Sequence, residues 1–262
     1  MKQEIRYILA DPTGNRTVLV ETPVRADRQP AVAAGLMELE PTAEQAGFLG
    51  RSEKADVALR MAGGEFCANA TMSAAVLCGM RTGKTTGRVS VEVSGAPEPV
   101  AVEIAAGEDG LWQGVVQLPR PGAIESVQFP DGQTCPVVSF DGISHVILEC
   151  VMPAAEAETL ARRRCAFLSA DALGLMFLDR AQSKLTPLVY VPRVDTLFWE
   201  TSCGSGTAAV GAFLAAETGR SVTAALKQPG GTLEINASPD GELRLRGTVR
   251  CVYERTAEIE TE

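Results

Sequence analysis

Residues 199–218 read WETSCGSGTAAVGAFLAAET, and this stretch decides the fold that we expect. Cys203 stands among small residues, directly before an Ala-rich run that is apolar nearly all round a helix, which is typical of a buried helix. The first turn of a helix has unpaired backbone N–H groups and a partial positive charge. That position favours the thiolate of Cys203, which is the reactive form of cysteine.

The same arrangement occurs earlier in the chain, where residues 67–80 read CANATMSAAVLCGM. CANAT at 67–71 matches CGSGT at 203–207, an offset of 203 − 67 = 136. Gly95 and Gly231, each in a predicted hairpin turn, keep that offset. An offset near half the chain length predicts a duplicated α/β unit. The alternative is coincidence among small residues.

Strand and helix signals alternate in both halves. The predicted strands are 5–9, 17–21, two within 88–104, 188–191, 196–199 and two around Gly230-Gly231, and the predicted helices are 31–39, 67–80, 155–164 and 203–218. PRPG at 119–122 is a plausible junction. We therefore expect an N-terminal domain, 1–119, to which a C-terminal strand at 248–262 returns, and a C-terminal domain, 120–247.

Composition narrows the classes of protein to consider. The chain has 262 residues, of which 45% are hydrophobic, enough for one large or two small domains. The net charge of −9 argues against nucleic acid or an anionic membrane as the partner. No apolar run approaches the roughly 18 residues that span a bilayer, and the first residues do not resemble a secretory signal. We expect a cytoplasmic protein.

The seven cysteines are irregularly spaced and include no CxxC pair, and His145 is the only histidine. These counts favour free thiols in a reducing compartment and no metal site. We take five cysteines as structural: Cys78, Cys135, Cys150, Cys165 and Cys251.

Two cysteines at helix starts would form a two-base site if their units face each other across a cleft. One thiolate would remove a proton from a carbon, and the other thiol would protonate its opposite side. The helix starts at Ala68-Asn69 and Gly204-Ser205 would bind the substrate's carboxylate through backbone N–H groups. This chemistry inverts a stereocentre.

GGEFCANAT at 63–71 and ETSCGSGT at 200–207 resemble the two active-site motifs of the diaminopimelate epimerase family, at matching order and spacing over most of the chain. The resemblance implies an α+β fold of two pseudo-symmetric domains, each a curled, mostly antiparallel sheet around a central helix. It also implies catalysis by Cys67 and Cys203 without a cofactor, a small amino-acid substrate, and a homodimer.

Further site residues follow from the same resemblance. Asn15 matches the family's substrate-contacting asparagine, and Asn69 lies in the first motif. Glu200 and His145 are further candidates for substrate contact. From the residues alone, the asparagines could be turn residues, Glu200 a structural helix-entry carboxylate, and His145 a core residue.

Within the superfamily the match is closer to the histidine racemases that make D-histidine for staphylopine-type metallophores, on GGEFCANATM, WETSCGSGTAAVG and QPGG. In that branch a glutamate in the segment resembling EQAGF at 44–48 reads the substrate side chain, which points to Glu44. A carboxylate can accept an imidazole N–H. The common alternative for Glu44 is an exposed helix residue. The segment 172–176 lacks the asparagine that diaminopimelate epimerase has there, which argues against diaminopimelate as substrate.

Four other functions remain as alternatives: a diaminopimelate epimerase, a racemase of another amino acid, an isomerase of the same fold acting on a non-amino acid, and a redox sensor with a disulfide. We also expect Phe198 and Trp199 to be core residues; the alternative is that one of them lines the pocket for the substrate side chain. The basic run Arg162-Arg163-Arg164 is typical of a solvated helix face.

Overall fold

The computed structural model describes residues 2–260, and the chain forms two compact units. The first unit runs to Gln117 and resumes at Arg246, and the second spans Leu118–Leu245. The sequence places the corresponding boundaries at 119/120 and 247/248. That the two units are separate domains stays a prediction.

The first unit is a closed barrel of eight strands with two helices. Its elements are β1 (Lys2–Pro12), β2 (Thr17–Val20), α1 (Gln29–Leu39), β3 (Gln45–Gly50), β4 (Val57–Met61), α2 (Ala68–Thr82), β5 (Thr86–Val93), β6 (Val100–Ala106), β7 (Leu111–Leu118) and β16 (Leu243–Glu260). The strand order is β1-β2-β3-β4-β5-β6-β7-β16, and β1 closes the barrel by pairing antiparallel with β16 from Lys2↔Glu260 to Pro12↔Val249. The β2–β3 and β4–β5 pairs are parallel.

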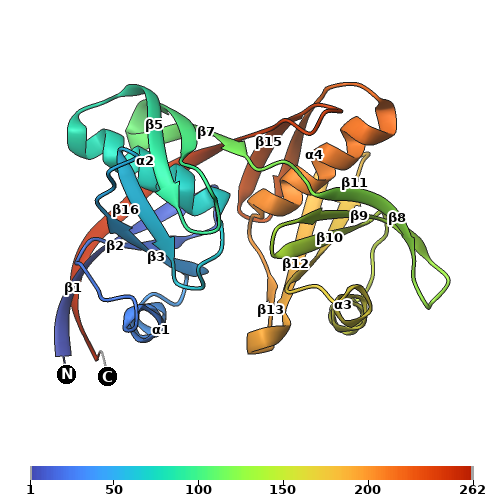
Figure 1. Ribbon diagram of the computed structural model, residues 1–262, viewed down its shortest axis with the longest axis horizontal. Helices are drawn as coiled ribbons and strands as arrows, with labels where there is room; N and C mark the ends of the chain where they lie inside the picture. Colours follow the sequence, from blue (N-terminus) through green and yellow to red (C-terminus); the bar gives the residue numbers. More distant parts are fainter. Residues whose placement is uncertain (1, 261–262) are drawn as a thin grey trace. The chain divides into compact units, whose positions relative to one another are not determined.

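Helix α2 contacts β1, β2, β4, β5 and β6, and lies among the curled strands of the first unit (Figure 1). Its residues from Ala68 to Leu77 are all buried. Most of them are small, so the strands can surround the helix closely. Helix α1 packs elsewhere on the barrel, where Val32 and Leu36 join a buried apolar cluster with residues of β1, β2 and β3. The apolar, small-residue character of α2 thus places its N-terminus inside the unit.

A buried carboxylate anchors the C-terminal strand. Glu40, at the end of α1, is 4% exposed and accepts hydrogen bonds from the Tyr7 hydroxyl of β1 (2.6 Å) and the Tyr253 hydroxyl of β16. Arg255 of β16 lies 3.5 Å from the same carboxylate. Burial and the Glu40 carboxylate raise the pKa of Tyr7 to about 12, so its hydroxyl stays a donor. These contacts join α1, β1 and β16.

The second unit is a mixed sheet with two helices. Its elements are β8 (Ala123–Gln128), β9 (Thr134–Phe140), β10 (Ile143–Leu148), α3 (Ala154–Leu168), β11 (Leu173–Asp179), β12 (Lys184–Val191), β13 (Thr196–Trp199), α4 (Gly204–Thr218), β14 (Val222–Gln228) and β15 (Gly231–Ala237). The strand order is β15-β14-β12-β11-β10-β9-β8, with β13 paired to β12 off this path. The β10–β11 and β12–β14 pairs are parallel.

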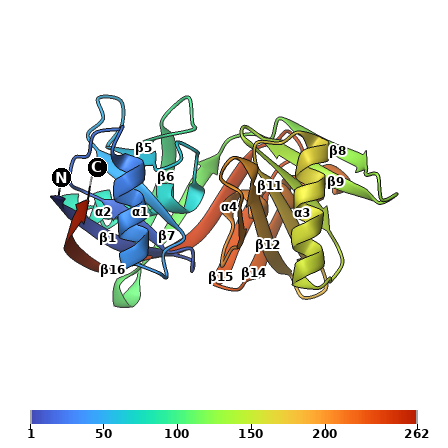
Figure 2. The same cartoon turned by 90° about the horizontal axis from the view of Figure 1, so that it is seen from below.

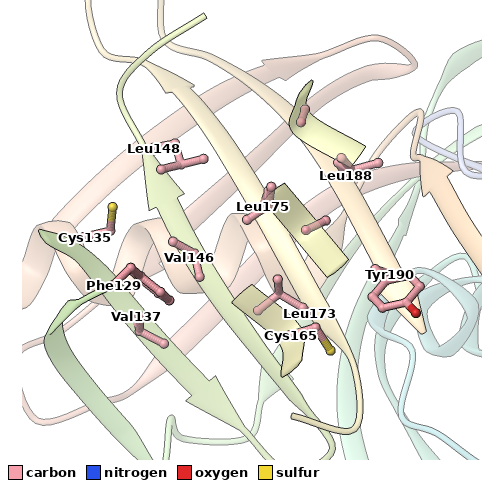
Figure 3. Close-up of a cluster of buried hydrophobic side chains, with 12 residues drawn as sticks. Phe129, Cys135, Val137, Val146, Leu148, Cys165, Leu173, Leu175, Leu188 and Tyr190 are labelled. Atoms are coloured by element: carbon pink, nitrogen blue, oxygen red, sulfur yellow. The ribbon is translucent and has the colours of Figure 1, made fainter. Parts of the chain in front are cut away.

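Helices α3 and α4 lie on opposite faces of this sheet (Figure 2). On the α3 face, Val146, Leu175 and Leu188 of neighbouring strands form the centre of a buried cluster (Figure 3). Side chains alternate between the faces of a strand. The positions beside this cluster, His145 on β10 and Met176 on β11, therefore point to the α4 side.

Arg164 corrects the expectation of a solvated basic face. The side chain is 2% exposed, with its guanidinium 4.2 Å from the centre of the Phe129 ring. It donates to Gln133 Oε1 (2.5 Å) and to Cys135 Sγ (3.2 Å), and pairs with Asp131 (3.4 Å). Cation–π contact and hydrogen bonds offset the desolvation of the buried charge.

The fold is therefore mixed α+β, with four α-helices among residues 2–260. Helices α2 and α4 each have 15 residues, begin after a cysteine and end at a left-handed glycine, Gly83 (φ 73°) and Gly219 (φ 64°). The cysteine, the first helical residue and the final glycine of α4 each lie 136 positions after their counterparts in α2. Within the described range, the structure contains no helix with the length and apolar character of a membrane span.

Candidate active site

Both candidate cysteines are helix N-caps with nearly the same backbone conformation. Cys67 precedes α2 with φ −131° and ψ 115°, and Cys203 precedes α4 with φ −117° and ψ 110°. Each sulfur accepts the backbone N–H of the third helical residue, Ala70 at 3.5 Å and Gly206 at 3.3 Å. A side-chain acceptor at an N-cap ordinarily occupies this position. The extended backbone before each helix therefore aims the sulfur at the positive end of the helix.

A threonine fixes each cysteine from one turn further along. Thr71 donates its hydroxyl to the Cys67 carbonyl oxygen at 2.7 Å, and Thr207 does the same to Cys203 at 2.6 Å. The backbone N–H of each threonine binds the same carbonyl, at 2.9 and 3.0 Å. The local geometry that the two motifs share thus extends from cysteine to threonine.

Cys203 is 4% exposed, and its pKa lies well above the usual range. Burial is the main cause, followed by the charge of Glu200 and its hydrogen bond to the thiol. The Ser205 hydroxyl, 3.5 Å from the sulfur, and the Gly206 N–H act in the opposite direction. Burial and Glu200 outweigh the helix terminus, so Cys203 carries its proton at neutral pH and is suited to donate it.

In the first unit, four side chains form a polar network beside the start of α2. Asn15 donates from Nδ2 to Glu44 Oε2 at 2.5 Å. Asn15 Oδ1 accepts from Asn69 Nδ2 at 3.1 Å and from Gln45 Nε2 at 2.6 Å. Asn15 and Asn69 are 5% and 2% exposed. The network holds Asn15 and Asn69 in fixed orientations and connects both to the Glu44 carboxylate.

The local chain explains how Asn15 and Glu44 come together. The turn after β1 uses left-handed backbone at Thr13 (φ 54°) and Gly14 (φ 92°), so Asn15 is not one of the strained turn residues. Glu44 precedes β3, which pairs parallel with β2 in register Thr17↔Gln45. Glu44 is therefore the residue just before a strand, and the reading as a helix glutamate is wrong.

His145 is fully buried on β10, and burial lowers its pKa to about 3. Its imidazole therefore stays neutral at any working pH. Gly174 of β11 leaves room for the ring, because a Cβ there would lie 2.2 Å from His145 Nδ1 and 2.7 Å from Met176 Cε. Met176 in turn reaches the first turn of α4 beside Gly206. Substrate contact by His145 stays a prediction.

Gly206→Ala is expected to destabilise the protein and to displace the Cys203 thiol. A Cβ at this position would lie 2.1 Å from Met176 Sδ and 3.1 Å from Cys203 Sγ. Overpacking of this kind costs about 1–3 kcal/mol, and misplacing a reacting group by about 1 Å can cost roughly 100-fold in rate. Thermal unfolding and the kinetics of the catalysed reaction measure the two effects separately.

Gly211→Ala is the matched control for that variant. It overpacks the same helix against Ile235, 2.6 Å from the added Cβ. Its activity per folded molecule should stay near that of the parent. Equal activity losses in both variants would contradict a specific effect on Cys203.

The structure brings several of the predicted site residues together. Asn15, Glu44 and Asn69 share one network, Ala68 begins α2, and Gly204, Ser205 and Glu200 surround Cys203. Two glutamines were missed, Gln45 and Gln228. Gln45 adjoins Glu44, and Gln228 begins the QPGG motif. Only these positions in the sequence could have indicated that the two glutamines lie at the site.

Phe198 and Trp199 are not core residues, which corrects the sequence prediction. They are 55% and 39% exposed, respectively, although Trp199 stacks on Phe177 with ring centres 5.8 Å apart. Among the described residues, β13 pairs with β12 and with no other strand, so it lies at an edge of the sheet.

Comparison with known proteins identifies the relatives. The family profile described as "Histidine racemase CntK N-terminal domain" matches residues 4–257. A histidine racemase of Fusobacterium nucleatum is 30% identical over 96% of both chains. A histidine racemase of Staphylococcus aureus is 28% identical over 81% of this chain and 80% of the relative.

Solved structures with the same fold are more distant in sequence. A "Predicted Epimerase" from Pseudomonas aeruginosa has a TM-score of 0.72 and 19% identity, covering 98% of this chain and all of that one. A probable proline racemase from Agrobacterium radiobacter has a TM-score of 0.70 and 12% identity, covering 97% and 92%. A PhzF-family protein from Bacillus anthracis has a TM-score of 0.69 and 14% identity, covering 97% and 99%.

These neighbours establish a fold of the PhzF and proline racemase type, which differs from the diaminopimelate epimerase fold expected from the sequence. The expected α+β class is confirmed. The family profile spans nearly the whole chain, and the curated relatives match it over comparable lengths. The chain belongs to the histidine racemase family.

Proposed function

We propose that this chain is a histidine racemase in which Cys67 and Cys203 interconvert L- and D-histidine. The observation that carries the thiol mechanism is the repeated N-cap: two cysteines, each accepting an N–H from the start of a buried 15-residue helix. Membership of the histidine racemase family supports the substrate.

The proposed reaction needs one thiolate and one thiol. The thiolate removes the α-proton of histidine, and the electron pair of the broken C–H bond moves into the carboxylate. The opposite thiol then protonates the α-carbon from its other side, and its own sulfur is left as a thiolate. Because the pKa of Cys203 is raised, its thiol is protonated before the reaction begins. This supports Cys203 as the proton donor in one direction of the reaction. Backbone N–H groups at Ala68-Asn69 and Gly204-Ser205 stabilise the carboxylate as charge develops.

Glu44 provides a carboxylate that can accept an imidazole N–H, held by its bond to Asn15. We assign Glu44 to recognition of the substrate's imidazole. We assign Asn15 and Asn69 to holding the Glu44 carboxylate in place and to contact with the substrate. We further propose that the units are pseudo-symmetric copies, since their cysteine helices agree in length, caps and numbering offset. The homodimer, the cytoplasmic location and a metallophore pathway remain predictions.

The test compares L-histidine with LL-diaminopimelate under reducing conditions without added pyridoxal phosphate. Chiral chromatography should show D-histidine forming until both enantiomers are equal, with diaminopimelate unchanged at equal enzyme concentration. Epimerisation of diaminopimelate alone would contradict the proposed substrate and retain the mechanism. Activity on neither would contradict the proposed function.

A further inference from the structure

Gln228, the last residue of β14, encloses the backbone of Cys203 in a ring of hydrogen bonds. Its Oε1 accepts the Cys203 N–H at 2.8 Å, and its Nε2 donates to Thr207 Oγ1 at 2.8 Å. The Thr207 hydroxyl donates to the Cys203 carbonyl oxygen. Gln228 is 7% exposed and Thr207 is fully buried, so water does not compete for these bonds. Both backbone polar groups of Cys203 are thereby fixed by side chains.

The chemistry of the ring requires an amide at position 228. A threonine hydroxyl has one proton, and here it is given to the Cys203 carbonyl, so Thr207 Oγ1 must accept from its other neighbour. The amide supplies that donor and also the acceptor that the Cys203 N–H needs. A carboxylate lacks the donor, and an aliphatic side chain lacks both.

The turn that follows Gln228 holds the segment leading into Cys203. Gly230 N–H donates to the Thr201 carbonyl oxygen at 2.8 Å. The segment from Thr201 to Cys203 is therefore attached to the β14–β15 hairpin by the Gly230 backbone bond and by the hydrogen bonds of the Gln228 side chain. These bonds to the β14–β15 hairpin fix the direction from which the chain enters α4.

The first unit has a different residue at the matching position. Gln228 is the buried last residue of β14, and the buried last residue of β5 is Val93, whose aliphatic side chain offers neither donor nor acceptor. Glu92, which is 136 positions before Gln228, lies on the exposed face of β5. The threonine bond to the cysteine carbonyl is common to both units, whereas the glutamine belongs to the second. A role in the fold that both units share therefore does not explain Gln228.

We propose that Gln228 is a positioning residue for Cys203, holding the thiol where it exchanges a proton with the substrate. This inference rests on the proposed function, because that function gives Cys203 its acid–base role. The ring of hydrogen bonds that the Gln228 amide completes fixes the backbone angles of Cys203, and these angles set the direction of its sulfur.

Gln228→Glu and Gln228→Leu test this role. The reactivity of Cys203 and of Cys67 is measured as the pH dependence of alkylation by iodoacetamide, resolved by peptide mass spectrometry. Racemisation kinetics give kcat and KM. Gln228→Glu keeps the shape and the acceptor, loses the donor and adds a negative charge. We expect the alkylation profile of Cys203 to move to higher pH, with that of Cys67 unchanged, and kcat to fall roughly ten- to 100-fold with little change in KM.

Gln228→Leu should lower kcat by a similar factor without the added charge. Thr207→Ser retains the hydroxyl and should keep near-parental kcat, whereas Thr207→Val should lose as much as Gln228→Leu. The double variant Thr207→Val/Gln228→Leu should be no worse than either single one, since each removes the same ring. Gln113→Glu, at an exposed position of β7, is the charge-matched control and should change neither profile.

A folded Gln228→Glu variant with parental kcat or an unchanged Cys203 profile would overturn the inference. If Gln228→Leu fails to fold, the isosteric Gln228→Glu variant still decides the question. Alkylation does not need a substrate, so the ring is tested even if the parent protein fails to racemise histidine. That failure would contradict the proposed function alone, whereas an active parent with unaffected Gln228 variants would contradict the positioning role alone.

Discussion

Replacing Cys203 or Cys67 with serine lowers the rate of histidine racemisation by roughly 10²–10⁴-fold in each case, because each variant loses one of the two acid–base groups. A hydroxyl fits the N-cap equally well but is far weaker as a base at neutral pH. The measurement is the initial rate from each enantiomer, with circular dichroism to verify folding.

Cys78→Ser is the matched control, since Cys78 lies on the helix that begins at the Cys67 motif and its thiol donates to the Asp56 carbonyl oxygen (3.9 Å). It should retain parental activity. Near-parental activity of either Cys67→Ser or Cys203→Ser would refute the two-thiol mechanism.

Glu44→Gln lowers kcat/KM for histidine by roughly ten- to 100-fold, the value of a hydrogen bond to a charged group. The amide is neutral, and it still meets Asn15 Nδ2, which donates to Glu44 at 2.5 Å in the parent. The effect should therefore fall on the substrate imidazole more than on the fold. Steady-state kinetics with histidine and with its two ring-methylated forms measure it.

Methylation of the ring nitrogen that faces Glu44 blocks that nitrogen, whereas the other methylated form can still present an N–H to the carboxylate as its imidazolium. The parent enzyme should therefore discriminate against the first form more than against the second. The Glu44→Gln variant should lose that discrimination. Glu53→Gln, at an exposed position of the same unit, controls for the change of charge. Equal losses for histidine and both methylated forms would show that Glu44 does not read the side chain.

The parts of the fold that sequence predicts well are those with local causes. Cys203 and Cys67 stand directly before helices because small, apolar residues follow them, and both helices end at glycines with positive φ. These signals lie within about 15 residues of each other. The repeat offset then relates one half to the other without any knowledge of packing.

Long-range contacts explain what the sequence did not reveal. Gln228 lies 25 positions from Cys203, and the packing of α4 against β14 brings it to the N-cap. Gln45 reaches Asn15 across the parallel β2–β3 pair. Such contacts depend on strand order, which periodicity does not encode.

Two errors have different origins. Arg164 follows the buried positions Ala157 and Ala161 at helical spacing, so the periodicity of α3 places it on the buried face. The three consecutive arginines obscured that signal. Trp199 is exposed because β13 has one partner strand, and an aromatic strand pattern alone does not distinguish an edge from a centre.

The central claim is that two groups on opposite sides of the α-carbon exchange its proton, and a reaction in D₂O tests it most directly. L-Histidine is converted to less than about a tenth of equilibrium, and the two enantiomers are separated and analysed by mass spectrometry. Thiol protons exchange rapidly with solvent, so the account predicts D-histidine that carries deuterium at the α-carbon, with the remaining L-histidine still protiated. D-Histidine that retains its original α-proton would mean that a single group removes and returns it, and would contradict the account.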